Sequence, residues 1–78
     1  GFYSRYKSFV ERTSEIVLEL NPKFKHPHTL VSTIVEGVHH QKFFSNHLPS
    51  LTDVKKNDAD ELACFYTNLA IATILKSK

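Results

Sequence analysis

The chain has 78 residues, of which 41% are hydrophobic and 23% charged, and its formal net charge is +2 at pH 7. This length gives one domain near the lower size limit for a fold held by its core alone, and the apolar content is too high for a disordered segment. Two glycines and three prolines leave few turns for an all-β fold of many short strands. The small positive charge favours solubility without requiring a nucleic-acid partner. The sequence therefore predicts one folded domain over residues 1–78.

Cysteine content and the N-terminal residues indicate the cellular setting. One cysteine, Cys64, excludes an internal disulfide and a thiolate metal cluster, which favours an intracellular location, cytoplasmic or nuclear. No stretch approaches the roughly 18 apolar residues of a membrane span, and the first residues lack the layout of a signal peptide. Methionine is absent even at position 1, so we expect the domain to be excised from a larger protein.

The first predicted helix ends before Asn21-Pro22. Mostly apolar residues recur three and four positions apart, as on one face of a helix: Tyr3, Tyr6, Val10, Thr13, Val17 and Leu20. Arg, Lys and Glu side chains fill most of the other face. The residue before a proline is pushed out of the α region, so the helix is expected to stop there.

A second helix is predicted from Pro27, which suits a first turn because its missing N–H costs nothing there. Its apolar stripe is formed by Leu30, Val31, Ile34, Val35 and Val38. At about 100° per residue, Phe43 falls about 150° from the centre of that stripe, so one straight helix cannot bury both. We therefore expect a break within residues 37–40, followed by a short third helix over residues 41–48 that buries Phe43, Phe44 and Leu48.

The last helix follows a polar connector over residues 50–57, in which Leu51 and Val54 are the expected anchors into the core. Asp58 is a typical N-cap residue, and Glu61 three positions later completes a pattern like a capping box. The helix then continues almost to the C-terminus. The sequence thus predicts an all-α fold, a compact bundle of four helices in the order long–short–short–long.

The last helix is apolar on two sides. At about 100° per residue, the stripe expected to face the core contains Leu62, Phe65, Tyr66, Leu69, Ala72 and Thr73. A second stripe on roughly the opposite side contains Cys64, Ile71 and Leu75. A chain of this length leaves few residues to cover both stripes, so the second one is expected to meet a partner.

Five histidines raise the question of a metal site. Helical ligands need a spacing of three or four residues, and only Glu36 with His39 or His40 meets it. Di-iron and di-manganese bundles use the Glu-x-x-His pattern twice and add two carboxylates, whereas this chain has one copy. We therefore expect no metal and no other cofactor, and we interpret Glu36 and His40 as an exposed pair at a helix end.

Basic residues provide the alternative function, a helical nucleic-acid-binding module. The residues that would carry it are Lys23, Lys25, His26, His28 and the His39–His40 pair. Protonation of these histidines near pH 6 also leaves a pH-sensitive or phosphate-binding patch open. Rings and cations interleave over residues 2–9, as in single-stranded nucleic-acid sites, yet Tyr3 and Tyr6 fall on the predicted core face. A solvated connector and an amphipathic core helix explain both patterns.

The sequence gives little support for catalysis. Cys64 lies mid-helix without a basic neighbour in sequence, and a cysteine in such a setting behaves as a small hydrophobe. No Gly-rich phosphate loop and no nucleophile motif occurs. We therefore expect no enzymatic activity.

The segment from Gly37 to Leu51, with its Phe43-Phe44 pair and Leu48-Pro49 stop, resembles the helix-turn-helix segment of harmonin-homology and paired-amphipathic-helix domains. The resemblance implies a small all-helical domain that binds an amphipathic helix of a disordered partner in a groove between helices. The chain departs from the family pattern in its long last helix and its few glycines.

Together, these observations predict a protein–protein interaction module that docks an amphipathic helix or self-associates as a homodimer through the last helix. The expected contact residues are Cys64, Ile71 and Leu75, with Lys42 and Lys76 at the polar rim. Each large apolar side chain would contribute roughly 1.5–3 kcal/mol on burial, which suits micromolar binding after the costs of association.

Overall fold

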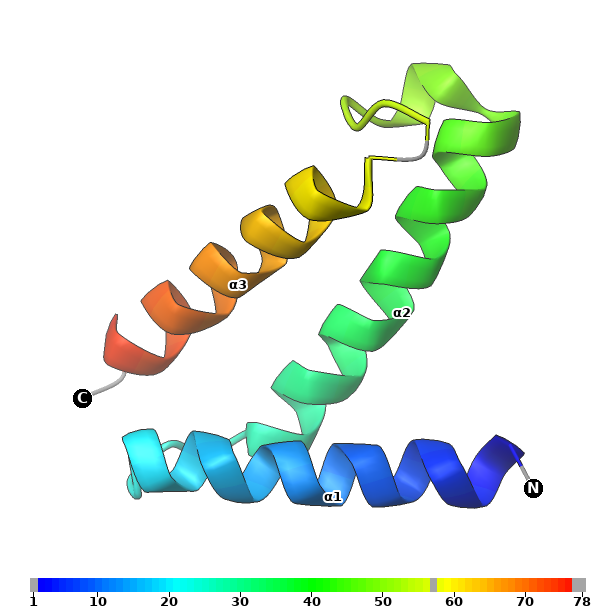
Figure 1. Cartoon of the computed structure of the whole chain (residues 1–78). Coiled ribbons are helices and arrows are strands. Elements are labelled where there is room, and N and C mark those ends of the chain that lie inside the picture. The colour runs from blue at the N-terminus through cyan, green and yellow to red at the C-terminus, as the bar shows by residue number, and fades with distance from the viewer. Residues whose placement is uncertain (1, 57, 77–78) are drawn as a thin grey trace.

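The computed structural model describes residues 2–56 and 58–76, with side chains from residue 3 onward. The described residues form three α-helices, α1 (Phe2–Leu20), α2 (Pro27–His47) and α3 (Ala59–Lys76), and a 3-10 helix, η1 (Pro49–Leu51) (Figure 1). They contain no strand, so the predicted all-α class is confirmed. Within the same ranges, no helix combines the length and the apolar character that crossing a membrane would require.

Helix α1 ends at Leu20, before Asn21-Pro22, as predicted. The side chains buried along this part of the chain are Val10, Ser14, Val17 and Asn21. Their spacing of four, three and four residues places them on one side of the chain. Ser14 and Asn21 are buried where Thr13 and Leu20 were predicted, so the buried stripe is displaced from the predicted one. The side chains that are exposed although they were predicted on or beside the core face are Tyr3, Phe9, Ile16 and Leu20.

Helix α2 is continuous across residues 37–40, so the predicted break and the separate third helix are wrong. Phe43 lies on the far side of this helix and is 53% exposed, so no break is needed to bury it. Its ring instead packs against His47 one turn later, with 4.8 Å between the ring centroids. Phe44 is partly buried, whereas Leu48, predicted to be buried with it, is 45% exposed.

The Thr52 side chain links the connector between α2 and α3 to α2 through a hydrogen bond. The Thr52 hydroxyl donates to Gln41 Oε1 at 2.5 Å and accepts the Val54 N–H at 3.1 Å. Val54 is partly buried, whereas Leu51 is exposed and does not act as the predicted anchor. The predicted connector also includes Asn57, which lies outside the described residues.

Two predicted helix starts are confirmed. Asp58 Oδ1 accepts a hydrogen bond from the Glu61 N–H at 3.0 Å, which is the N-cap geometry. Pro27 occupies the first turn of α2. Both signals depend only on residues within one helical turn, so they can be recognised from the sequence without knowing the tertiary structure.

The helices form an open, flat layer instead of the predicted compact bundle. Helices α2 and α3 meet at the connector and diverge toward α1, which crosses the open end (Figure 1). The fold spans 38 × 33 × 17 Å, so it is about half as thick in its shortest direction as in the other two. Its radius of gyration is 13.8 Å, against about 11.5 Å for a compact domain of this length.

The core of this layer is small. Among the described residues, five apolar side chains are buried: Val10, Val17, Val31, Leu62 and Ile74. Four of them form one cluster where α1, the start of α2 and the end of α3 meet, and Tyr6, Phe24 and Leu30 pack against it. The buried Asn21 amide donates to the Ile74 carbonyl oxygen at 3.0 Å and joins the end of α1 to the last turn of α3.

The buried side of α3 is rotated by about 70° from the predicted stripe, at about 100° per residue. The side chains that are buried or partly buried are Leu62, Tyr66, Ala70, Thr73 and Ile74. Phe65 and Leu69, predicted as core, are 60% and 47% exposed. A close contact with α2 accompanies this orientation, because a Cβ on Gly37 would lie 2.5 Å from the Tyr66 hydroxyl oxygen.

Candidate functional site

The solvent side of α3 is mostly apolar. Its residues, which we call the α3 outer face, are Cys64, Phe65, Asn68, Leu69, Ile71, Ala72 and Leu75. All seven are exposed, and the four large apolar side chains among them are between 47% and 60% exposed. Asn68 supplies the polar group on this face, and its Nδ2 donates to Cys64 Sγ at 3.6 Å.

No charged residue lies between Glu61 and Lys76, so α3 carries charge only at its two ends. Water-exposed helices in globular proteins usually place charged residues opposite the core face. A helix that is apolar all round is normally buried on all sides. In this molecule α3 is covered on one side only, so its uncharged outer face is exposed to solvent.

The structure brings together part of the predicted site. Cys64, Ile71 and Leu75 are all exposed on α3, and Lys76 is exposed in its last turn beside Leu75. Lys42 projects from α2 near Asp58 and Leu62, at the start of α3. Leu62 and Leu75 are 13 positions apart, about 20 Å along a helix, so Lys42 lies at the opposite end of α3 from Leu75.

Sequence reasoning assigned three residues of the α3 outer face to the core, Phe65, Leu69 and Ala72, and it did not single out Asn68. The available signal was the absence of charge from residue 62 to residue 75. That signal predicts an interface on α3 without indicating which apolar stripe faces the core.

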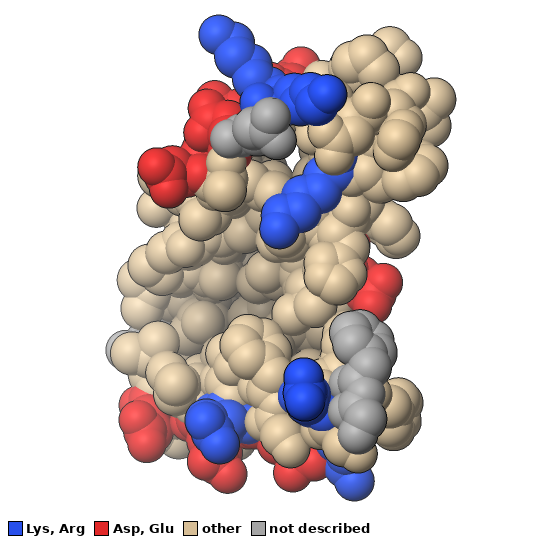
Figure 2. Space-filling model, turned by 45° about the vertical axis from the view of Figure 1, so that its right-hand side comes forward, with Lys and Arg blue, Asp and Glu red and all other residues tan. Residues whose placement is uncertain are grey.

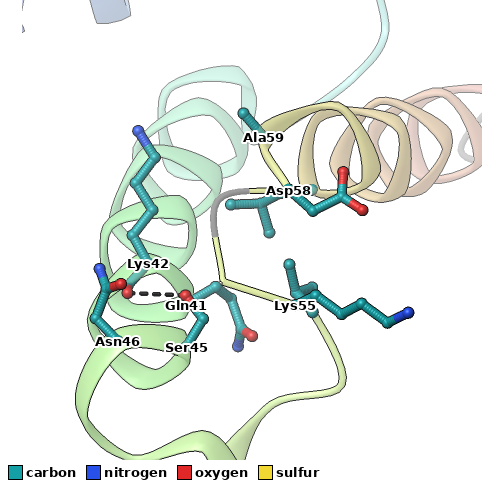
Figure 3. A pocket seen from close by; sticks show the side chains of 9 residues that line it. Gln41, Lys42, Ser45, Asn46, Lys55, Asp58 and Ala59 are labelled. Atoms are coloured by element: carbon teal, nitrogen blue, oxygen red, sulfur yellow. Dashed lines mark hydrogen bonds between the residues drawn. The ribbon is translucent and has the colours of Figure 1, made fainter.

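Lys42 lines a cavity of about 330 Å³ between α2 and the start of α3. In Figure 3, Lys42 and Lys55 extend away from each other, and the Asp58 carboxylate points away from Lys42. The Ser45 hydroxyl donates a hydrogen bond to the Lys42 carbonyl oxygen one turn earlier, at 3.0 Å. Among the described residues, the charged side chains that line this cavity do not converge on a common point.

A second, smaller cavity lies between the three helices, and all of its lining residues except Thr13 are apolar. Its volume is about 140 Å³, and it is lined by Phe9, Thr13, Val17, Leu30, Val31, Ile34, Val35 and Ala70. Figure 2 shows a hollow in the middle of one face of the molecule, with Lys, Arg, Asp and Glu gathered above and below it.

The histidines do not assemble into a ligand set. Within residues 2–56 and 58–76, no three His, Cys, Asp or Glu side chains are placed to hold one metal ion. Glu36, the one residue with helical ligand spacing to a histidine, accepts the Tyr6 hydroxyl at 3.3 Å instead. Partial burial and then the Glu36 carboxylate raise the pKa of Tyr6 above its ordinary value of 10.0.

The basic residues of the nucleic-acid alternative are spread along the molecule. Lys23, Lys25, His26 and His28 are exposed at the α1–α2 connection and the start of α2. His39 and His40 are exposed too, but they follow 11 and 12 positions after His28, about 16–18 Å along α2. Figure 2 shows positive and negative side chains mixed at both ends of the face in view.

No protein-family model, curated protein or solved structure matches the chain.

Proposed function

We propose that the chain is a protein–protein interaction module that binds an apolar helical segment through the α3 outer face. The observation that supports this proposal is the uncharged stretch from residue 62 to residue 75, in which nine of the fourteen residues are exposed. Exposed apolar patches of this kind mark contact sites in small domains. The module has no proposed catalytic role.

The open shape of the molecule supports the same proposal. A layer 17 Å thick buries few side chains, and a helix laid against α3 would add a second layer. Fully burying a large apolar side chain contributes roughly 1.5–3 kcal/mol, so burying the exposed half of four contributes roughly 1 kcal/mol each. After the cost of association, this gain fits a weak, micromolar contact.

The mode of binding in the proposal is helix against helix. The resemblance of residues 37–51 to harmonin-homology and paired-amphipathic-helix domains adds support, since those domains bind amphipathic helices. In this chain the proposed contact lies on the last helix, and the resembling segment forms the second half of α2 and η1. The resemblance therefore supports the class of partner and supplies no contact residue.

The proposal requires that a charge on the α3 outer face leaves the fold intact. Ile71→Glu should shift the thermal unfolding midpoint by a few degrees at most, because the side chain is already half exposed. Ile74→Glu, three residues later and 4% exposed, should abolish the unfolding transition, because a buried unpaired charge is very costly. If Ile71→Glu also abolishes the transition, the outer face is buried within the domain and the proposal fails.

Contact with a partner can be tested by photo-crosslinking. A photo-reactive residue replaces Ile71, and the chain is irradiated in an extract of the cells that produce it. A matched control carries the same group at Ile16, which lies on α1 and is 52% exposed. We expect covalent products with a polypeptide from position 71 that are absent from position 16. They should persist at high salt, since apolar docking barely responds to salt whereas phosphate-driven binding weakens steeply. Equal labelling from both positions would contradict the proposal.

A further inference from the structure

We infer that the helix bound by the α3 outer face is α3 of a second copy of this chain, in antiparallel orientation. The inference rests on the proposed function and names its partner. It follows from the distribution of charge on α3, where Asp60 and Glu61 lie in the first turn and Lys76 in the last. The residues between them carry no charge.

The two possible orientations of an α3 pair differ in their electrostatics. A parallel pair places the acidic first turns side by side and the basic last turns side by side, and like charges repel. An antiparallel pair places each acidic turn beside the other copy's Lys76, and it also opposes the two helix dipoles. The antiparallel orientation is therefore the favoured one, and an interface between identical faces closes with two-fold symmetry.

The spacing of residues on the α3 outer face fits such a pair. A line of side chains at intervals of four, three, four and three residues runs down its middle: Glu61, Phe65, Asn68, Ala72 and Leu75. This alternation is the seam of a two-helix contact. With the two-fold axis near residue 70, Phe65 meets the second copy's Leu75, and Asn68 meets the second copy's Ala72. Large pairs then close both ends, and a small pair allows close approach in the middle.

The size of the contact sets the strength of the dimer. Helix α3 has 18 residues, a length of about 27 Å, and one side of it covers roughly 300 Å². Stable dimers bury about 800 Å² per partner, so this one is weak. We expect a dissociation constant on the order of 100 µM, which requires measurements at high protein concentration.

Sedimentation equilibrium of the whole chain from about 10 µM to about 1 mM tests the second copy as partner. We expect a reversible monomer–dimer equilibrium that Leu75→Glu weakens at least tenfold. The matched control is Leu20→Glu, because Leu20 lies on α1 and has the same 53% exposure as Leu75. It should leave the equilibrium unchanged. A chain that stays monomeric throughout, or a dimer weakened equally by both variants, overturns the inference.

Orientation is tested by oxidation of cysteine variants. In the antiparallel pair the two Cys64 side chains lie about 18 Å apart along the helix axis, so the wild-type chain should form no disulfide dimer. In a Cys64→Ser background, Asn68→Cys mixed with Ala72→Cys should form the mixed disulfide. Rapid oxidation of wild-type Cys64 with none of the mixed product would show a parallel pair and overturn the inference.

The proposed function and this inference can fail separately. If the chain is monomeric but position 71 still forms products with another protein, the second copy is wrong as partner and the interaction module stands. If Ile71→Glu unfolds the chain, both fail.

Discussion

Helices α1 and α3 have nearly the same length, 19 and 18 residues, but they separate polar and apolar side chains in different ways. Helix α1 carries charges along its solvent side, where Lys7 Nζ lies 3.9 Å from Glu11 Oε1. Such an exposed pair adds little stability. The charged side chains nevertheless keep that side of α1 exposed to solvent, because burying them would require their desolvation. Helix α3 carries charge at its ends alone, so burial of its solvent side would not require the desolvation of a charge.

This difference shows which property of a helix determines its orientation. In α1 the charged side excludes most rotations about the helix axis, because a buried unpaired charge is costly. In α3 several rotations bury a similar apolar area, so specific contacts choose among them. Two such contacts are the fit of Tyr66 against Gly37 and the hydrogen bond from Asn21 to the Ile74 carbonyl oxygen.

The largest expected effect compares two neighbouring residues on α3. Ile74→Ala should lower the free energy of unfolding by roughly 2–5 kcal/mol, since a buried side chain is removed from the main cluster. Leu75→Ala should cost less than about 1 kcal/mol, because that side chain is about half exposed. Chemical denaturation of both variants measures the difference. Equal losses would mean that the two sides of α3 are equally buried.

The sequence predicted the features that depend on neighbouring residues. The end of α1 follows from Pro22, the start of α2 from Pro27, and the cap of α3 from Asp58 and its contact with Glu61. Each of these signals acts within one turn of helix, so no knowledge of the tertiary structure is needed.

The sequence did not predict how the helices pack. The break in α2 was inferred from the need to bury Phe43, but an open layer leaves that ring exposed, and the need disappears. The predicted core stripe of α3 placed Phe65 and Leu69 inside, because an uncharged helix gives no indication of its solvent side. The exposed position of Ile71 and Leu75 could be anticipated, since one small domain cannot cover two apolar stripes.

A second prediction concerns the polar contact that orients the end of α3. The Ile74 carbonyl is one of the last four of its helix, which have no partner within the helix, and the Asn21 amide satisfies it. Asn21→Asp keeps the acceptor for the Lys23 N–H but removes this donor, so it should cost roughly 1–3 kcal/mol. Asn68→Asp on the α3 outer face is the matched control and should change the free energy of unfolding little. A harmless Asn21→Asp would show that packing alone orients α3.

A third prediction concerns the contact between α2 and α3. Replacing a mid-helix glycine with alanine normally stabilises a helix by about 1 kcal/mol. At Gly37 the new Cβ would lie 2.5 Å from the Tyr66 hydroxyl oxygen and 3.0 Å from its ring carbon Cζ, so Tyr66 must move. Gly37→Ala should therefore destabilise the chain slightly, by about 1 kcal/mol or less. In a Tyr66→Ala background the same change should stabilise it, and a sign that stays the same in both would exclude this contact as the cause.

The smallest expected effect is the pH dependence of the contact between α1 and α2. The Tyr6 hydroxyl donates to Glu36 Oε1 at 3.3 Å, and partial burial followed by this carboxylate raises the pKa of Tyr6 above 10.0. Since the folded state has the higher pKa, the contribution of Tyr6 to stability is fully present below pH 10.0 and is lost as the pH rises through the folded pKa. The ultraviolet titration of the wild-type chain minus that of Tyr6→Phe isolates this group, and Glu36→Gln should lower its midpoint toward 10.0. An unchanged midpoint in Glu36→Gln would show that the Glu36 carboxylate does not contribute to the raised pKa of Tyr6.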